Sequence, residues 1–300
     1  MSKEPILVAG ANGLLGRAIA TRLLQHGYAV RALSRDAKKL ETMAALGAEP
    51  FAADMLDRAA MDRACAGVAQ LVTTANNLLG KGPRSCNRID EPMYRTLGAA
   101  ANASGVRRWI HISARNIAAD SPVDYFRVKH RVEGIVRDSG VPWVLVRPSA
   151  FMDVWTGVLF GDAERPAPVP TLFGRGDRVA NYIAISDVVS FVLAILGNAA
   201  VRNEVVEIGG PSEKTFVEFT VPIQKSMGVP EKRKHVPAPV LGLARHVARP
   251  FNEAAARLAS LGYWTTLADR PFPEWREAAR RFGVEPITVE QFAERFAARD

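Results

Sequence analysis

Three side chains near the middle of the chain are of types that together can deliver a proton to a carbonyl oxygen. Tyr125 and Lys129 are four residues apart in a segment of helical periodicity, so both project from one helical face. A phenol is a poor acid at neutral pH, and a neighbouring ammonium lowers its pKa. Ser113, at the end of an apolar strand, would hold the oxygen. We therefore predict that Tyr125, Lys129 and Ser113 are catalytic.

The start of the chain supplies a phosphate-binding loop that would place a cofactor beside these residues. An apolar strand runs into Gly10, Gly13 and Gly16, and an amphipathic helix follows. Gly10 would allow a tight turn, Gly13 close approach of a pyrophosphate, and Gly16 packing of the helix on the strand. The positive end of that helix would face the phosphates, so the pattern predicts dinucleotide binding.

The tip of the second strand indicates which dinucleotide binds. NAD-selective folds place a carboxylate there, whereas this chain has Ser34 followed by Arg35, with Lys38 or Lys39 one turn later. These cations suit a 2'-phosphate, which favours NADP (NADPH) over NAD. Rotation of Asp36 toward the ribose stays an alternative.

Asp54, after the third strand, is expected to bind the adenine amine or to cap the next helix. Further cofactor contacts are expected from neighbouring loop positions, and Lys129 would also bind the nicotinamide ribose. These positions are Asn12, Leu14, Leu15, Met55, Thr74, Ala75, Asn76 and Pro148. No metal ligand set is predicted.

Strands and helices alternate through the first half of the chain. Strands are expected at 28–33, 49–53, 70–74, 108–113 and 143–146, with a polar loop at 78–90 and helices at 91–104 and 125–139. This order predicts an α/β fold with a Rossmann-type, doubly wound parallel sheet. We assign 1–150 to the cofactor-binding domain, with 180–210 returning to it.

The remaining segments, 151–179 and 211–300, are assigned to a smaller C-terminal substrate lobe. Helices are expected to begin at capping-box patterns at Thr215 and Thr288. Between them, 229–250 is rich in Pro and basic residues. Aromatic residues cluster after Ala150 and near the end of the chain, and they suit either a small core or a pocket for a flat substrate.

Composition narrows the class of protein. The net charge of +8 is scattered along helices beside acids and no nucleic-acid motif accompanies it, so we expect no nucleic-acid partner. Cys65 and Cys86 form no paired motif, and no apolar run is long enough to span a bilayer, so a cytoplasmic location is predicted. His111 alternates with Ile110 and Ile112 and is interpreted as an interior residue.

These motifs give the chain a family resemblance. It resembles the atypical or extended short-chain dehydrogenases/reductases, in particular the NmrA-like and complex I 39-kDa-subunit-like NAD(P)-binding proteins. The matching positions are 10–16, 30–35, 54–57, 147–149, 185–188 and 207–211, with Tyr125, Lys129 and Glu133. The resemblance implies a Rossmann domain that binds NAD(P) and a C-terminal lobe that closes over substrate. The segment 118–122 is shorter than in the family pattern, which leaves the reach of Tyr125 open.

The leading hypothesis is an NADPH-dependent reductase of a carbonyl or quinone group on a small, aromatic molecule. The first alternative is a non-catalytic NADP(H)-binding redox sensor or assembly protein with a protein partner. A nucleotide-sugar epimerase or dehydratase is the third hypothesis, because it uses the same Ser, Tyr and Lys. A homo-oligomer is compatible with each of them.

Overall fold

The computed structural model describes residues 4–161 and 167–297, and the chain divides into two compact units. The first contains residues 1–147 and 189–206, and the second 148–188 and 207–300. Each unit is therefore built from discontinuous segments. The assignment of substrate binding to the second unit stays a prediction.

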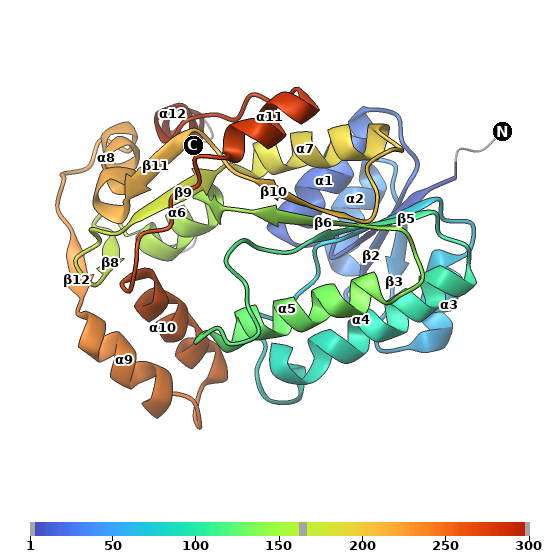
Figure 1. Cartoon of the computed structure of the whole chain (residues 1–300), viewed down its shortest axis with the longest axis horizontal. Helices are drawn as coiled ribbons and strands as arrows, with labels where there is room; N and C mark the ends of the chain where they lie inside the picture. The colour runs from blue at the N-terminus through green and yellow to red at the C-terminus, as the bar shows by residue number, and fades with distance from the viewer. Residues whose placement is uncertain (1–3, 162–166, 298–300) are drawn as a thin grey trace. The chain divides into compact units, whose positions relative to one another are not determined.

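The first unit is organised around a parallel sheet whose strand order is β10-β6-β5-β4-β1-β2-β3 (Figure 1). Its elements are β1 (Ile6–Ala9), α1 (Leu14–Gln25), β2 (Val30–Ser34), the 3-10 turn η1 (Lys38–Leu40), α2 (Glu41–Ala45), β3 (Glu49–Ala52), α3 (Arg58–Cys65), β4 (Gln70–Thr73), the 3-10 turn η2 (Gly82–Arg84), α4 (Cys86–Ala103), β5 (Arg108–Ile112), α5 (Asp124–Arg137), β6 (Trp143–Pro148) and β10 (Glu204–Ile208). α7 (Ile185–Gly197) begins in the second unit and ends in the first. The doubly wound α/β fold predicted from the sequence is confirmed.

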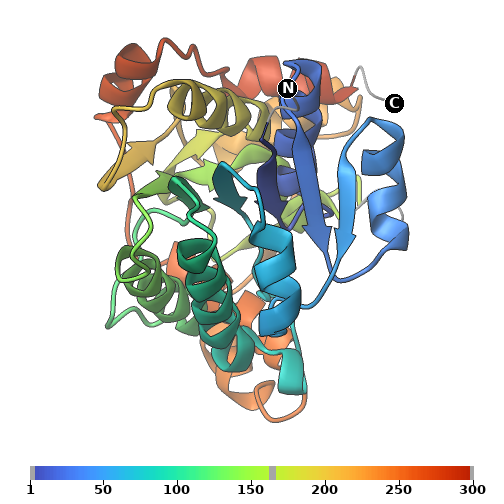
Figure 2. The same ribbon diagram turned by 90° about the vertical axis from the view of Figure 1, so that its right-hand side faces the viewer.

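The central strands are almost entirely buried, as expected of a sheet covered on both faces. β1 is buried at all four positions and pairs in parallel with both β2 and β4. Figure 2 shows the blue strands at the start of the chain side by side. α3, α4 and α5 pack in sequence against one another on one face, and α1 packs on β1 and β2.

The strand order reverses between β1 and β4. From β1 the sheet continues through β2 and β3 on one side, and from β4 it continues through β5 and β6 on the other side. In open α/β sheets the crevice outside the carboxyl ends of two such strands collects ligands. Gly10 and Thr74 directly follow β1 and β4, so the glycine loop lies at this switch point.

α4 begins earlier than the sequence pattern indicated. The polar loop expected at 78–90 ends at Ser85, and the helix starts at Cys86 rather than Glu91. Pro92 lies inside the helix, and the buried side chains of Ile89 and Asp90 anchor the turns before it. Asp90 is therefore a helical residue, which matters for the site described below.

The second unit contains two small sheets and a set of short helices. Its elements are β7 (Ala150–Phe151), α6 (Met152–Phe160), β8 (Thr171–Phe173), β9 (Val179–Ile183), β11 (Ser212–Thr215), α8 (Phe216–Ser226), β12 (Lys234–Val236), α9 (Ala238–Val247), α10 (Glu253–Thr265), α11 (Trp275–Phe282) and α12 (Val289–Ala297). Tyr182, Phe216 and Phe219 lie in its apolar core, with the Tyr182 and Phe219 rings stacked at 4.5 Å.

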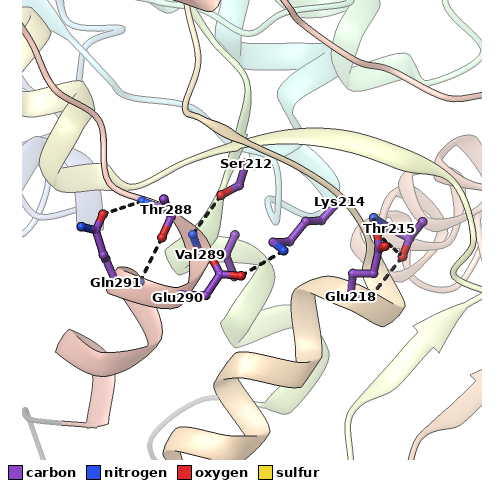
Figure 3. A network of polar contacts seen from close by, with 8 residues as sticks. All are labelled: Ser212, Lys214, Thr215, Glu218, Thr288, Val289, Glu290 and Gln291. Atoms are coloured by element: carbon purple, nitrogen blue, oxygen red, sulfur yellow. Dashed lines mark hydrogen bonds and ion pairs between the residues drawn. The ribbon is translucent and has the colours of Figure 1, made fainter.

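Both predicted capping boxes are confirmed. Thr215 Oγ1 accepts a hydrogen bond from Glu218 N, and the Glu218 carboxylate accepts one from Thr215 N (Figure 3). Thr288 and Gln291 exchange the equivalent pair of bonds at the start of α12. Ser212 Oγ also accepts a hydrogen bond from Val289 N, so this bond joins β11 to α12.

Candidate dinucleotide and reductase site

The loop between β1 and α1 is packed so closely that two of its glycines are required by the protein itself. Gly10 has φ +90°, and a Cβ there would lie 2.7 Å from Thr74 Oγ1 and 2.8 Å from Ala75 N. A Cβ on Gly16 would overlap the Gly10 carbonyl oxygen. Thr74, expected to contact the cofactor, thus packs against the glycine loop.

Gly13 differs from both, because the protein leaves the space beside it open. It is exposed, its φ is −79°, and a Cβ would meet only Gly10 O at 3.5 Å, an ordinary contact. No side chain caps α1, and no acidic residue lies in its first turn. The helix end can therefore receive the phosphates of a dinucleotide, and the loop fits that cofactor.

The tip of β2 presents the exposed cations Arg35 and Lys39 together with the exposed Asp36. Ser34 is buried and its Oγ accepts a hydrogen bond from Asp36 N. The Asp36 carboxylate accepts from Lys38 N within its own turn. Arg35 and Lys39 are exposed, and neither forms an ion pair within the described part of the chain. This arrangement suits a 2'-phosphate.

Asp54 lies in a cluster that the sequence did not indicate. Its Oδ2 accepts a bond from Arg84 at 2.6 Å and its Oδ1 one from Leu56 N. Burial alone raises the pKa of Asp54, but the Leu56 amide, Arg84 and Arg35 together hold it below its usual value. The expectation that Asp54 caps α3 is wrong, because Asp57 is the cap and accepts from Ala60 N.

The remaining predicted cofactor residues differ in exposure. Asn12, Leu14 and Asn76 are exposed, whereas Leu15, Met55 and Pro148 are buried. Asn76 bonds locally to Thr74 O and Leu78 N. The Ala75 carbonyl accepts a 2.7 Å bond from the buried Tyr94 hydroxyl, which ties the loop after β4 to α4.

The side chains predicted to be catalytic converge where α5 packs on β5. Lys129 is buried, and its Nζ donates to Ile112 O at 3.2 Å and lies 5.5 Å from the centroid of the Tyr125 ring. Burial lowers the pKa of Lys129 to about 8, although the negative charges of Asp90 and Glu133 act to raise it. Tyr125 is also buried, at 7% exposure.

Ser113 follows Ile112 and completes the group. Its N–H bonds to Val146 O at 2.7 Å, which fixes it on β6. Its Oγ is buried and forms no hydrogen bond of ordinary geometry within the described residues, although it lies close enough to Glu133 to lower the pKa of that carboxyl. The structure thus places Lys129 beside the Tyr125 ring and against the carbonyl of Ile112, the residue before Ser113.

Glu133 continues the spacing of Tyr125 and Lys129 along α5 and is fully buried. Arg147 of β6 donates two bonds to its carboxylate, at 2.9 and 2.6 Å, and Arg137 donates a third at 3.1 Å. Burial raises the pKa of Glu133, but Arg147, Ser113 and Arg137 more than offset this effect and hold it below the usual value. Glu133 therefore remains a carboxylate that attaches α5 to β6.

Comparison with known proteins shows to which family the chain belongs. A family model described as NAD(P)H-binding matches residues 10–199, which is more than half of the chain. The chain belongs to this NAD(P)H-binding family. It is the NmrA-like, extended short-chain dehydrogenase/reductase group that the motifs resembled.

Relatives within and beyond this family differ in what they do. The chain is 30% identical over 297 residues to (4-alkanoyl-5-oxo-2,5-dihydrofuran-3-yl)methyl phosphate reductase of Streptomyces griseus, covering 93% of this chain and 100% of that protein. It is 25% identical to the photosystem II assembly factor Ycf39 of Cyanophora paradoxa, over 81% and 75% of the two chains. The NADPH complex of a quinone oxidoreductase from Escherichia coli has the same fold, with a TM-score of 0.76, 20% identity, and coverage of 97% and 99%.

Beyond the family motifs, Asp90 stands out as a residue that the sequence did not indicate. It is 2% exposed, its carboxylate accepts from Asn77 Nδ2 at 2.8 Å, and its charge raises the pKa of Lys129. It was expected in a loop, and only its true place on α4 brings it toward α5.

His111 is interior, as predicted, and both cysteines are also buried. His111 is 1% exposed, and its Nδ1 lies 2.9 Å from Thr73 Oγ1. Its Nε2 has no hydrogen-bond partner among the described residues. Burial and the charge of Lys129 hold its pKa well below the usual value. Cys65 and Cys86 are buried and form no disulfide with each other, and burial raises the pKa of Cys65 to about 12.

None of the described helices is long and apolar enough to cross a membrane.

Proposed function

We propose that this protein is an NADPH-dependent reductase that acts on a carbonyl or quinone group of a small aromatic molecule. The observation that carries the proposal is the buried Lys129, which lies between the Ile112 carbonyl and the Tyr125 ring, with the buried Ser113 hydroxyl one residue along the chain from Ile112. The full-length similarity to a reductase from Streptomyces griseus supports the choice of reduction.

NADPH supplies a hydride when it is bound. The residues of the chain would then bind and protonate the oxygen of the substrate. Ser113 Oγ–H would donate a hydrogen bond to this oxygen, and the Tyr125 hydroxyl would donate the proton. Because the pKa of Lys129 is about 8, this side chain is mostly an ammonium at neutral pH. That charge would favour loss of the proton from the neighbouring phenol as the proton passes to the substrate.

The preference for NADPH over NADH rests on the tip of β2. Arg35 and Lys39 are exposed there, while the Asp36 carboxylate is bonded to its own turn. A 2'-phosphate would meet these cations, whereas Ser34 stands at the position where NAD-selective folds have a carboxylate for the ribose.

The test is NADPH oxidation with a panel of quinones and aromatic carbonyl compounds. Tyr125→Phe should lower turnover about 100-fold or more, the scale of general acid catalysis, with cofactor affinity nearly unchanged. Tyr28→Phe, which removes a phenolic hydroxyl elsewhere in the first unit, is the matched control. Full turnover by Tyr125→Phe on a good substrate would show that tyrosine is not the acid.

A second candidate is a non-catalytic NADP(H)-binding protein that assists the assembly of a protein complex. The similarity to the assembly factor Ycf39 supports it. This function predicts tight NADPH binding with no turnover on any member of the panel, and a change in partner binding when NADPH is added. The epimerase hypothesis predicts turnover of a nucleotide sugar without net oxidation of cofactor.

A further inference from the structure

An apolar stripe on α9 has no partner in the described part of the chain. Val240, Leu243 and Val247 are spaced to lie on one face of the helix, and they are 52%, 65% and 57% exposed. Phe251, in the turn that follows, is 88% exposed. Monomeric domains rarely present such a row of large apolar side chains without using it.

The opposite face of α9 explains why this stripe points outward. Leu241 is 5% exposed, and Gly242 approaches the Tyr263 ring of α10 so closely that a Cβ would lie 3.3 Å from it. Arg245 stacks on that same ring at 4.6 Å. α9 and α10 therefore pack side by side, as Figure 1 shows, and the stripe is not needed to hold the helix in place.

The segment that carries the stripe is basic, although Glu231 and Glu253 flank it. Residues 232–252 contain five Lys or Arg, two His and no Asp or Glu. Lys232, Lys234 and Arg249 are exposed. A short helix with an exposed apolar face and basic surroundings is the pattern of a segment that lies in the interface of an anionic lipid bilayer.

The same charge disfavours a second copy of the chain as the occupant. A two-fold interface would place each cationic segment against its own copy, and like charges at close range repel. We propose that the α9 stripe docks this protein on anionic membrane surfaces, with Leu243 and Phe251 inserted among the lipids and Lys232, Lys234 and Arg249 facing the head groups.

The experiment is sedimentation of the whole protein with vesicles, one set of phosphatidylcholine alone and one with phosphatidylglycerol added. Binding should be strong only to the anionic vesicles and should weaken in high salt. Leu243→Ser should weaken it about tenfold, whereas Leu46→Ser, an exposed leucine of the first unit, should not. The double variant Lys232→Gln/Lys234→Gln should bind anionic vesicles roughly 25-fold more weakly, because each charge contributes about fivefold to the affinity.

Three results would overturn the proposal. One is no binding to either kind of vesicle, and another is equal binding to both. The third is a dimer, seen by light scattering without lipid, that Leu243→Ser converts to a monomer, because then a second copy covers the stripe. The variants lie on the surface, and circular dichroism checks that they fold.

Discussion

Gly13 and Gly16 are three residues apart, yet the protein constrains them for different reasons. Gly16 lies against the Gly10 carbonyl and Thr74 Oγ1, so its lack of a side chain is an internal packing requirement. Gly13 is exposed at an ordinary backbone conformation, so only a bound ligand would require a glycine there. Substitutions at the two glycines should therefore affect different properties, stability at Gly16 and cofactor binding at Gly13.

We predict that Gly13→Val leaves the protein folded and abolishes binding of NADPH, because the branched side chain fills the space expected for the pyrophosphate. Gly16→Ala should instead lower the melting temperature, since a new Cβ overlaps backbone and costs roughly 1–3 kcal/mol. Thermal melts and NADPH titration measure the two effects. Normal affinity in folded Gly13→Val would mean that the dinucleotide binds elsewhere.

The second prediction concerns Arg35. Its replacement by Asp should weaken NADPH binding by roughly 10–100-fold and leave NADH binding less affected, because a repelling charge replaces the cation for the 2'-phosphate. Titration of both cofactors measures the ratio. Arg63→Asp makes the same change of charge on the exposed side of α3 and should leave the ratio unchanged. Equal affinity of the unmodified protein for both cofactors contradicts the assignment.

At the scale of elements, α5 carries Tyr125, Lys129 and Glu133 at four-residue intervals. The Arg147–Glu133 bonds attach this helix to β6, and the Lys129–Ile112 bond attaches it to β5. A shift of the helix along the sheet would therefore break polar contacts that are buried, which are costly to lose. Glu133 therefore helps to fix the helix that carries Tyr125 and Lys129.

Glu133→Gln tests this attachment. It removes the carboxylate from two partly exposed arginines, so we expect a loss of stability of about 2 kcal/mol. It also removes a charge that raises the pKa of Lys129, so the fall in turnover expected as pH rises past about 8 should begin at lower pH. Denaturant unfolding and the pH profile of turnover measure the two effects. Glu91→Gln, which breaks the more exposed pair with Arg131, should move neither by a comparable amount.

An unchanged pH profile in Glu133→Gln would limit this residue to a structural role. If the predicted fall above pH 8 is absent from the unmodified protein, the proposed role of the Lys129 ammonium is wrong.

Local patterns revealed most of the elements and only part of the site. The glycine loop and both capping boxes could be predicted because the pattern of each lies within about seven positions of the sequence. Asp90 and Arg84 could not, since their importance comes from the contacts of α4 and η2 with distant segments. The boundary of α4 was also hidden, because Pro92 suggests a helix start although buried side chains extend the helix before it.

For the whole molecule, Asp187 makes stability depend on pH. It is 5% exposed near the start of α7, and its carboxylate accepts bonds from Ile287 N at 3.0 Å and from Ser186 Oγ. Burial raises its pKa to about 6, against the effect of these bonds. Because the folded pKa lies above the unfolded one, ionisation of Asp187 destabilises the fold as pH rises from about 4 to about 6.

Asp187→Asn should remove this dependence. The melting temperature of the variant relative to the unmodified protein should rise by roughly 5 °C between pH 4 and pH 7, and then stay constant. Only the difference is informative, because carboxylates such as Glu133 have lowered pKa values and act in the opposite direction. A difference that does not change with pH would show that Asp187 titrates normally.

β10 forms one edge of the sheet beside β6, although residues 149–203 separate the two strands in the chain. Asn203 fastens the junction, because its Oδ1 accepts from Trp143 N and its own N–H donates to Trp143 O. During synthesis on a ribosome, β6 is complete long before its outer neighbour is made. Until the segment up to Ile208 has emerged, the nascent chain therefore exposes one side of β6 that is paired in the folded protein, and such an unpaired side can pair with another chain and promote aggregation.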